Sequence, residues 1–365
     1  MPYDLKAPTI GFDFARFRCV AERPGKALLE LTDPTGRSIV TDSRQPVEFE
    51  NEFLHAFAVE RLAVATRYQA VAILDADRTA PLTVTTLRPP AGKPRFRFGI
   101  LADPHGSTRP QPKGPRLLPH AFDLAAESLA RMRRHGADFA VILGDATNKG
   151  TDEEIDRFRA VVDAAPLPCR IMAGNNDAQL DKFVRVFDLG RGYYAFDHQG
   201  VHVVCLLTAW PDDLATLGEQ FGWLRDDLAT HAAMPTLIFS HYALFDPPSH
   251  RIEEDRVVSN ADDVCRFLRT QPQVKAVFSG HKNIPALNRD GHVAHIVCPQ
   301  VCHYDCAFDL VDVYPDALVH TLWEIDRPDL LRFSQKQLRP PRDADYRYGP
   351  ESARNFVLPL GTVNR

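Results

Sequence analysis

The stretch RIMAGNNDAQL, residues 170–180, is an apolar run that ends in glycine and opens directly into two asparagines and an aspartate. Four other apolar runs end in similar polar clusters, namely ADPHG at 102–106, GDATNKG at 144–150, FSHY at 239–242 and SGHKN at 279–283. Amphipathic helical stretches lie between the strand-like runs, and this alternation predicts an α/β layered sheet. Ligands of such sheets bind just beyond the carboxyl ends of the strands, where all five clusters lie. The sequence therefore predicts one site built from all of them.

The overall composition limits the classes of partner that this protein is expected to bind. The 365 residues are about two domains long. A formal net charge of −5 leaves no basic footprint for nucleic acid. The N-terminus lacks a charged start followed by an apolar segment, and no uninterrupted apolar stretch approaches membrane-spanning length. We expect a cytoplasmic protein that acts on a small molecule, without membrane or nucleic-acid partners, and we leave self-association into a homo-oligomer open.

The chain divides into three parts that differ in their hydrophobic pattern. Residues 1–92 show short strand-like runs between Pro, Gly and Asp turn signals, which predicts a small all-β sandwich domain. The segment LAVATRY at 62–68 resembles the late strands of a fibronectin type III domain, in which a tyrosine such as Tyr68 forms the tyrosine corner. Residues 95–325 carry the α/β pattern. Residues 326–365 have no periodicity and are predicted to wrap the surface.

The five clusters offer carboxylates, imidazoles and amide oxygens. This donor set suits Mn, Fe, Zn or Mg-like ions and disfavours copper-type thiolate sites. Two such ions, about 3.5–4 Å apart, would clamp the attacking and leaving oxygens of a phosphoryl transfer. They would also lower the pKa of a bound water toward neutrality. A lone histidine at a strand end more often makes a structural hydrogen bond than binds a metal. Five polar clusters that all follow apolar strands, however, are better explained by a shared metal site than by chance.

In order and spacing the clusters resemble the blocks of the calcineurin-like metallophosphoesterases, D-x-H, G-D-x-x-[DN]-x-G, G-N-H-[DE], H and G-H-x-H. The resemblance covers roughly residues 95–325 and implies a four-layer αββα sandwich. Purple acid phosphatases carry a similar all-β domain before this fold. The resemblance also implies two divalent ions, Mn, Fe or Zn, and hydrolysis of a phosphomonoester or phosphodiester by attack of a metal-bound hydroxide. It assigns Asp103, His105 and the bridging Asp145 to the first ion, and Asp145, Asn175, His241 and His281 to the second.

Two positions depart from the family pattern. Asn283 stands where the family has a histidine ligand of the first ion. A neutral amide oxygen binds Zn or Fe less well than imidazole does, so we expect a weak or labile first site. Whether Asn283 binds the ion or water completes the shell is left open.

Asn176 stands where the family has its catalytic histidine. General-acid catalysis at that place is typically worth about 10²- to 10⁴-fold, and an amide cannot deliver a proton near neutral pH. We therefore expect slow reaction with alkyl phosphates, substrates with good leaving groups, or a different acid.

Further residues are expected to support the site loops or to contact the substrate. Asp177 is expected to cap the following helix and hold the turn, and Asn148 to hydrogen-bond within the Asp145 loop. Four side chains in loops could approach as proton donors or substrate contacts, although each is more often plain surface: His250, Lys282, His303 and Tyr304.

CPQVCHYDC, residues 298–306, spaces three cysteines four apart. Cys298, Cys302 and Cys306 lack the paired C-x₂-C turns of common zinc sites, so we expect buried or rim thiols. The odd total of seven cysteines, several inside apolar runs, also fits reduced thiols better than disulfides.

Two other functions stay open at this level. The chain could be a non-catalytic or weakly active binding module whose site decayed at Asn176 and Asn283, although every second-ion ligand is kept. Alternatively, an open first site would permit altered, iron-dependent chemistry on a non-phosphate bond. The sequence offers no positive sign of the latter.

Overall fold

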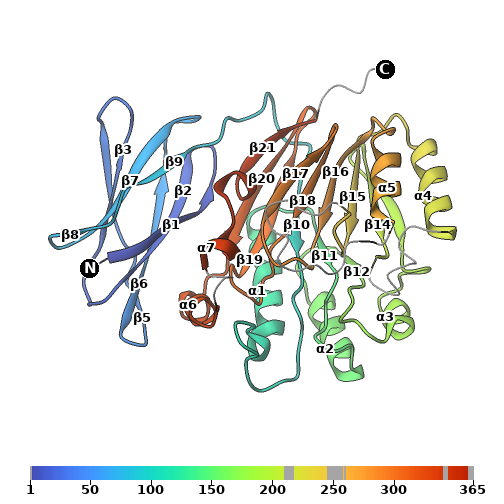
Figure 1. The fold of residues 1–365 in the computed structure, drawn as a ribbon, viewed down its shortest axis with the longest axis horizontal. Coiled ribbons are helices and arrows are strands. Elements are labelled where there is room, and N and C mark those ends of the chain that lie inside the picture. The colour runs from blue at the N-terminus through green and yellow to red at the C-terminus, as the bar shows by residue number, and fades with distance from the viewer. Residues whose placement is uncertain (1, 209–217, 245–257, 259, 340–343, 361–365) are drawn as a thin grey trace.

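The computed structural model describes residues 2–208, 218–244, 258, 260–339 and 344–360. An all-β module, residues 2–85, stands beside a larger α/β body that begins at β10 (Figure 1). His250, predicted as a proton donor or substrate contact, lies outside the described residues.

The all-β module is a sandwich of two antiparallel sheets, as the sequence predicts. One sheet has the order β1-β2-β6-β5, with bounds β1 Pro2–Ile10, β2 Phe14–Ala21, β6 Glu52–Glu60 and β5 Val47–Phe49. The other has the order β4-β3-β7-β8, with β9 also on β7; its bounds are β4 Ser38–Asp42, β3 Leu28–Thr32, β7 Arg67–Leu74, β8 Asp77–Arg78 and β9 Leu82–Thr85.

Alternating burial along the strands builds the core of this module. Leu29 and Leu31 point inward from β3, and every second residue of β7 does the same. The buried Tyr68 accepts a hydrogen bond through its hydroxyl from the backbone N–H of Ala63 at 2.9 Å. This is the contact to the upstream backbone that a tyrosine corner requires. The fibronectin type III class itself stays a prediction.

The α/β body contains two six-stranded sheets. The first has the order β12-β11-β10-β19-β20-β21, with bounds β12 Cys169–Met172, β11 Phe139–Leu143, β10 Phe96–Leu101, β19 Ala307–Val313, β20 Ala317–Glu324 and β21 Phe356–Pro359. The second has the order β13-β14-β15-β16-β18-β17, with bounds β13 Tyr194–His198, β14 Val201–Leu206, β15 Thr236–Ser240, β16 Val274–Ser279, β18 Val293–Val297 and β17 Ala286–Asp290.

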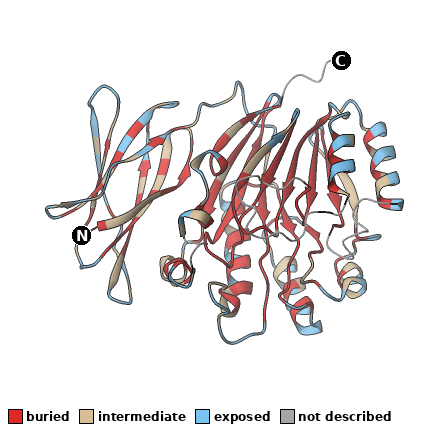
Figure 2. Ribbon diagram, in the orientation of Figure 1, coloured by how far each residue is buried: buried red, intermediate tan, exposed pale blue. Residues whose placement is uncertain are grey.

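The two sheets face each other across an apolar layer. Phe98 of β10 lies edge-on to Phe239 of β15 and Phe278 of β16, with ring centroids 5.7 and 5.9 Å away. Phe239 and Phe278 stack on each other at 5.1 Å. Because both faces of these strands are covered, they are buried along nearly their whole length, as Figure 2 shows.

Helices cover the outer face of each sheet. α1 Ala121–Arg134, α2 Asp152–Asp163 and α3 Leu180–Val186 pack on the first sheet, and α4 Glu219–Thr230 and α5 Ala261–Leu268 pack on the second (Figure 1). The side chain of Thr151 caps α2 by accepting from the N–H of Glu154. The layers therefore run helix, sheet, sheet, helix, which confirms the predicted four-layer fold.

The segment after residue 326, predicted to wrap the surface, contains regular elements in its described residues. It forms α6 Pro328–Lys336, α7 Ala344–Tyr348 and the edge strand β21, which pairs with β20 from Ala317↔Pro359 to His320↔Phe356. These elements are too short to leave a periodic pattern in the sequence.

Polar contacts fix the all-β module to the body. Arg18 of β2 donates to Glu324 at 3.0 and 3.1 Å and to the hydroxyl of Tyr304 at 2.8 Å. Arg332 of α6 donates to Glu52 of β6 at 2.7 and 2.9 Å. Because these side chains are largely buried, the two parts form one continuous structure rather than two loosely tethered domains.

Candidate active site

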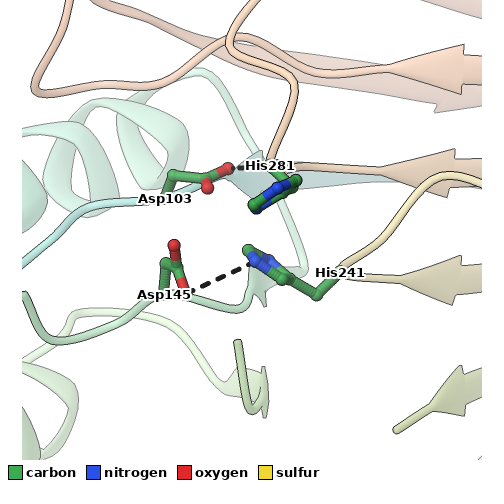
Figure 3. A group of neighbouring side chains, drawn as sticks. All are labelled: Asp103, Asp145, His241 and His281. Carbon is green, nitrogen blue, oxygen red and sulfur yellow. Dashed lines mark hydrogen bonds and ion pairs between the residues drawn. The ribbon is translucent and has the colours of Figure 1, made fainter. Parts of the chain in front are cut away.

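The strand-end clusters meet at one edge of the paired sheets. Asp103 follows β10, Asp145 follows β11, His241 follows β15 and His281 follows β16. Their side chains point toward one another (Figure 3). Each offers one ligand atom, and these four atoms all lie within 4.8 Å of one another. Residues from both sheets thus form a single group that could hold a metal ion.

His241 is oriented by the backbone. Its Nδ1 lies 2.9 Å from the carbonyl oxygen of Leu143, which can only accept, so Nδ1 carries the proton. Nε2 then points into the site, 3.1 Å from Asn175 Oδ1 and 3.3 Å from Asp145 Oδ1. A protonated ring donates to these oxygens, and a neutral ring offers its Nε2 lone pair to an ion held between them. A histidine held in this way by a carbonyl is the arrangement of a metal ligand.

The other side of the site carries buried atoms without partners. His105 Nε2 lies 3.7 Å from Asp145 Oδ2, and Asp103 Oδ2 accepts from the N–H of His281 at 2.8 Å. Within the described residues, Asp103 Oδ1 and Asn283 Oδ1 are buried without a hydrogen-bond partner. Buried oxygens of this kind need an explanation, and a bound cation supplies one.

Five of the predicted site residues adopt the left-handed backbone conformation that side chains other than glycine rarely take. Their φ angles are 46° at Asp103, 47° at His105, 47° at Asp145, 64° at His281 and 59° at Asn283. Such strain persists only where the surroundings impose it, and it concentrates at active sites and ligand clamps.

Two glycines allow the site loops to approach closely. A Cβ on Gly174 would stand 2.0 Å from the backbone nitrogen of Asp145, and one on Gly280 would stand 2.6 Å from Asp103 Oδ2. Neither position can hold a larger residue without moving a site carboxylate, which explains why these apolar runs end in glycine.

Asn176 contacts the central carboxylate twice. Its backbone N–H donates to Asp145 Oδ1 at 2.7 Å, and its side-chain Nδ2 donates to Asp145 Oδ2 at 2.6 Å. Asn176 therefore lies at the site and directs its amide to Asp145.

Asp177 does not cap the helix that follows it. α3 begins at Leu180 with no side-chain cap. The carboxylate instead accepts from the N–H of Ala146 at 3.2 Å, the N–H and hydroxyl of Thr147 at 2.8 and 2.7 Å, and the N–H of Gly174 at 2.8 Å. The helix cap is thus a wrong prediction, whereas Asp177 does hold the turn, by tying it to the Asp145 loop.

The Asp145 loop is also held through its backbone. Asn148 is buried, and its N–H donates to the carbonyl oxygen of Gly106 at 3.0 Å, which links this loop to the one that carries His105.

Two of the candidates for a proton donor, Tyr304 and His303, are not arranged as one. Tyr304 is fully buried and directs its hydroxyl to Arg18 of the all-β module. His303 is buried with Nδ1 2.7 Å from the Tyr304 carbonyl oxygen, and burial together with the charge of Arg347 lowers its pKa to about 3. Its ring is neutral near pH 7, with the Nδ1 proton directed to that carbonyl, so it is not an imidazolium acid. Lys282 is buried as well.

Burial and neighbouring charges shift the pKa values of the site residues in different directions. Burial and the negative charge of Asp145 raise the pKa of Asp103 to about 7. Burial and the charge of Arg116 hold the pKa of His105 well below its usual range. Burial alone would lower the pKa of His241, but Asp145 and Asp103 raise it overall. A cation held among these groups would relieve the repulsion between the two carboxylates.

Two residues at the site were missed by the sequence reasoning. Gln300 is buried, with Nε2 2.9 Å from His105 Nε2. Arg116 is half-buried, and its charge acts on Asp103, His105 and His303. Gln300 follows the apolar run of β18 and so repeats the strand-end pattern. It lies between Cys298 and Cys302, and only the cysteines of this segment were considered as possible ligands from the sequence.

Those cysteines are buried thiols, as expected. Cys298, Cys302 and Cys306 are fully buried and free, and burial raises the pKa of each. None of them belongs to a possible metal-binding group among the described residues.

Comparison with known proteins decides the family. The sequence model described as "Calcineurin-like phosphoesterase" matches residues 96–285, just over half of the chain. The chain belongs to the calcineurin-like phosphoesterase family. This confirms the predicted family and makes the protein a phosphoester hydrolase of unspecified substrate. No curated protein sequence matched the chain.

Solved structures are similar to the chain to different degrees. A dimetal phosphatase from Danio rerio is 18% identical, with a TM-score of 0.55 over 63% of this chain and 96% of that chain. PhoD is 10% identical, with a TM-score of 0.40 over 87% and 85% of the two chains. GAP50, the anchor in the inner membrane complex of Plasmodium, is 14% identical, with a TM-score of 0.43 over 65% and 86%. Among the described helices of the present chain, none is long and apolar enough to cross a membrane.

Proposed function

We propose that this member of the family is a two-metal phosphoesterase that cleaves small phosphomonoesters or phosphodiesters with good leaving groups. The observation that carries the proposal is the group formed by Asp103, Asp145, His241 and His281, whose ligand atoms lie within 4.8 Å of one another. Carboxylate and imidazole ligands of this kind suit Mn, Fe or Zn.

The donors divide into two sets about the central carboxylate. Asp103, His105 and Asp145 would hold the first ion, and Asp145, Asn175, His241 and His281 the second. When bound, such a pair supplies Lewis-acid polarisation of the phosphoryl group and activates water. The contacts of His241 Nε2 to Asn175 and Asp145, at 3.1 and 3.3 Å, support the second set.

Asn176 limits the range of leaving groups. Its amide can donate a hydrogen bond to a substrate oxygen or to Asp145, but it cannot release a proton. The neutral, buried His303 and the inward-facing Tyr304 do not replace the missing acid. A leaving group that departs as a stable anion, such as an aryl oxide, needs no proton, so the proposed substrates are activated phosphoesters.

Arg116 is proposed to bind the phosphate. Its half-buried guanidinium acts electrostatically on Asp103 and His105, and it forms no ion pair within the described part of the chain. A guanidinium suits a phosphate because its paired N–H groups match two phosphate oxygens.

The proposal is tested by metal analysis of the purified protein and by turnover of aryl phosphate mono- and diesters with Mn, Fe or Zn added. We expect two ions per chain and hydrolysis of at least one ester class, lost on chelation. A protein that binds no metal and turns over neither ester would overturn it. Two bound ions without turnover would favour the non-catalytic module.

A further inference from the structure

Gln300 lies directly beside His105, a predicted ligand of the first ion, which we expect to be bound more weakly than the second. Its side chain is 1% exposed, and its Nε2 lies 2.9 Å from Nε2 of His105. The Gln300 Oε1 atom is buried and has no hydrogen-bond partner within the described residues. A buried amide that satisfies only one of its ends is an uncommon feature.

Strand register places this side chain. Gln300 lies three residues beyond the end of β18 and forms an isolated parallel bridge with Ala102, next to Asp103. The backbone N–H of Val301 donates to the Ala102 carbonyl oxygen at 3.3 Å. The link between the two sheets therefore brings Gln300 to the loop of Asp103 and His105.

The spacing fits two ligands of one ion. His105 Nε2 faces the central carboxylate, 3.7 Å from Asp145 Oδ2. Ligands about 2.1 Å from an octahedral ion and at right angles to each other lie about 3.0 Å apart. The 2.9 Å between the head groups of Gln300 and His105 matches this separation.

The amide can turn to serve an ion. In this orientation Gln300 donates N–H to the lone pair of His105, which leaves that lone pair unavailable to a cation. A half turn of the terminal amide exchanges Nε2 and Oε1, which are nearly the same size. The oxygen then lies beside His105 and the NH₂ takes the buried position that Oε1 held, so that a cation can bind the imidazole lone pair and Oε1 together.

We infer that Gln300 binds the first metal ion through Oε1 and supplies the ligand that the family's histidine at the Asn283 position would give. Asn283 also has a buried, unpartnered Oδ1, but of these two residues Gln300 is the one whose side chain contacts a predicted first-ion ligand, His105. The inference rests on the proposed two-metal function.

Titration of metal-free protein with Mn²⁺, followed by electron paramagnetic resonance and calorimetry, tests the inference without any substrate. We expect two ions per wild-type chain. Gln300→Met keeps the size of the side chain and removes the oxygen, so the first ion should bind at least about 10-fold more weakly while the second is unchanged. Gln300→Glu replaces the amide with a carboxylate and should bind the first ion more tightly.

Gln273→Met is the matched control. Gln273 is also 1% exposed, and its side chain donates to the carbonyl oxygen of Leu228. Gln273 directly precedes β16, so it lies at the end of that strand opposite to the site. Its loss should leave both ions bound with wild-type affinity. Thermal unfolding of each variant checks that it is folded.

The outcomes separate this inference from the proposed function. Two Mn²⁺ ions bound to Gln300→Met with wild-type affinity would overturn the role of Gln300, as would a weaker first ion in Gln300→Glu. A wild-type chain that holds only one ion would also overturn it. Two ions in the wild type, one lost in Gln300→Met, and no hydrolysis of any phosphoester would uphold Gln300 while overturning the proposed activity.

Discussion

The side-chain amide of Asn176 donates to Asp145 Oδ2 at 2.6 Å, while the backbone N–H of the same residue donates to Oδ1 at 2.7 Å. Both oxygens of the central carboxylate are therefore positioned by one residue. Asp145 is itself 1% exposed, so these contacts replace the water that the carboxylate loses on burial. What this residue cannot do is protonate a leaving group, and that deficit can be measured.

Replacing Asn176 by histidine should restore a general acid. We expect Asn176→His to raise turnover of alkyl phosphates by up to about 10²-fold, with a smaller effect on aryl phosphates, whose leaving groups need no proton. Rates for a matched alkyl and aryl pair measure the ratio. Asn176→Gln keeps an amide and serves as the control. An equal change for both esters would mean that the residue does not stand beside the leaving group.

Asp145→Asn should remove the carboxylate shared by both ion sets. We expect the bound metal to fall from two ions to one or none, and turnover to drop by at least about 100-fold. Elemental analysis and initial rates check this. Asp226→Asn, an exposed change on α4, should alter neither. Full activity in Asp145→Asn would contradict the proposed ligand sets.

Asp177→Asn should destabilise the fold. An amide can accept with only one oxygen, and its NH₂ would meet some of the four donors from Ala146, Thr147 and Gly174. Burial and the charge of Asp145 raise the pKa of Asp177 to about 7, so the carboxylate is fully charged only above about pH 8. There, hydrogen bonds to a buried charged group make this loss about 2–3 kcal/mol. Urea unfolding of the metal-free protein measures it. Asp181→Asn, an exposed change on α3, is the control, and an equal effect there would refute the argument.

His202 should give the fold a pH dependence. Its Nδ1 lies 2.7 Å from Asp197 and its Nε2 lies 2.7 Å from Asp227, so both nitrogens donate only when the ring is protonated. Burial lowers its pKa, but the two carboxylates outweigh burial and leave the pKa raised. The extra stability is complete below the unfolded value of about 6.5 and is lost as pH rises through the higher folded pKa.

The free energy of unfolding of wild type and His202→Gln, compared from pH 5 to 9, measures this dependence. The difference should be largest at the acid end and should shrink above about pH 6.5. Titrations elsewhere in the chain cancel in the comparison. A difference that stays constant across the range would show that folding does not shift the pKa of His202, and one that grows as pH rises would show that the folded ring is held neutral.

The gathering of Asp103, Asp145, His241 and His281 could be predicted because each follows an apolar, strand-like run. Parallel strands bring their carboxyl ends to one edge of a sheet, so position along the chain is enough to place such residues together. Asn175 and Asn176 were found in the same way. The same alternation of strands and helices predicted an α/β layered sheet, and the family resemblance implied its four layers.

Contacts between segments far apart in the chain could not be predicted in this way. The bridge between Gln300 and Ala102, the turn of Tyr304 toward Arg18, and the pairing of β21 with β20 each join residues that no local pattern relates. The sequence by itself determined the fold class and the side chains offered at the strand ends, because periodicity and local turns encode both. Only the tertiary structure decided which neighbours those side chains have, because long-range packing sets each loop's direction and each side chain's partner.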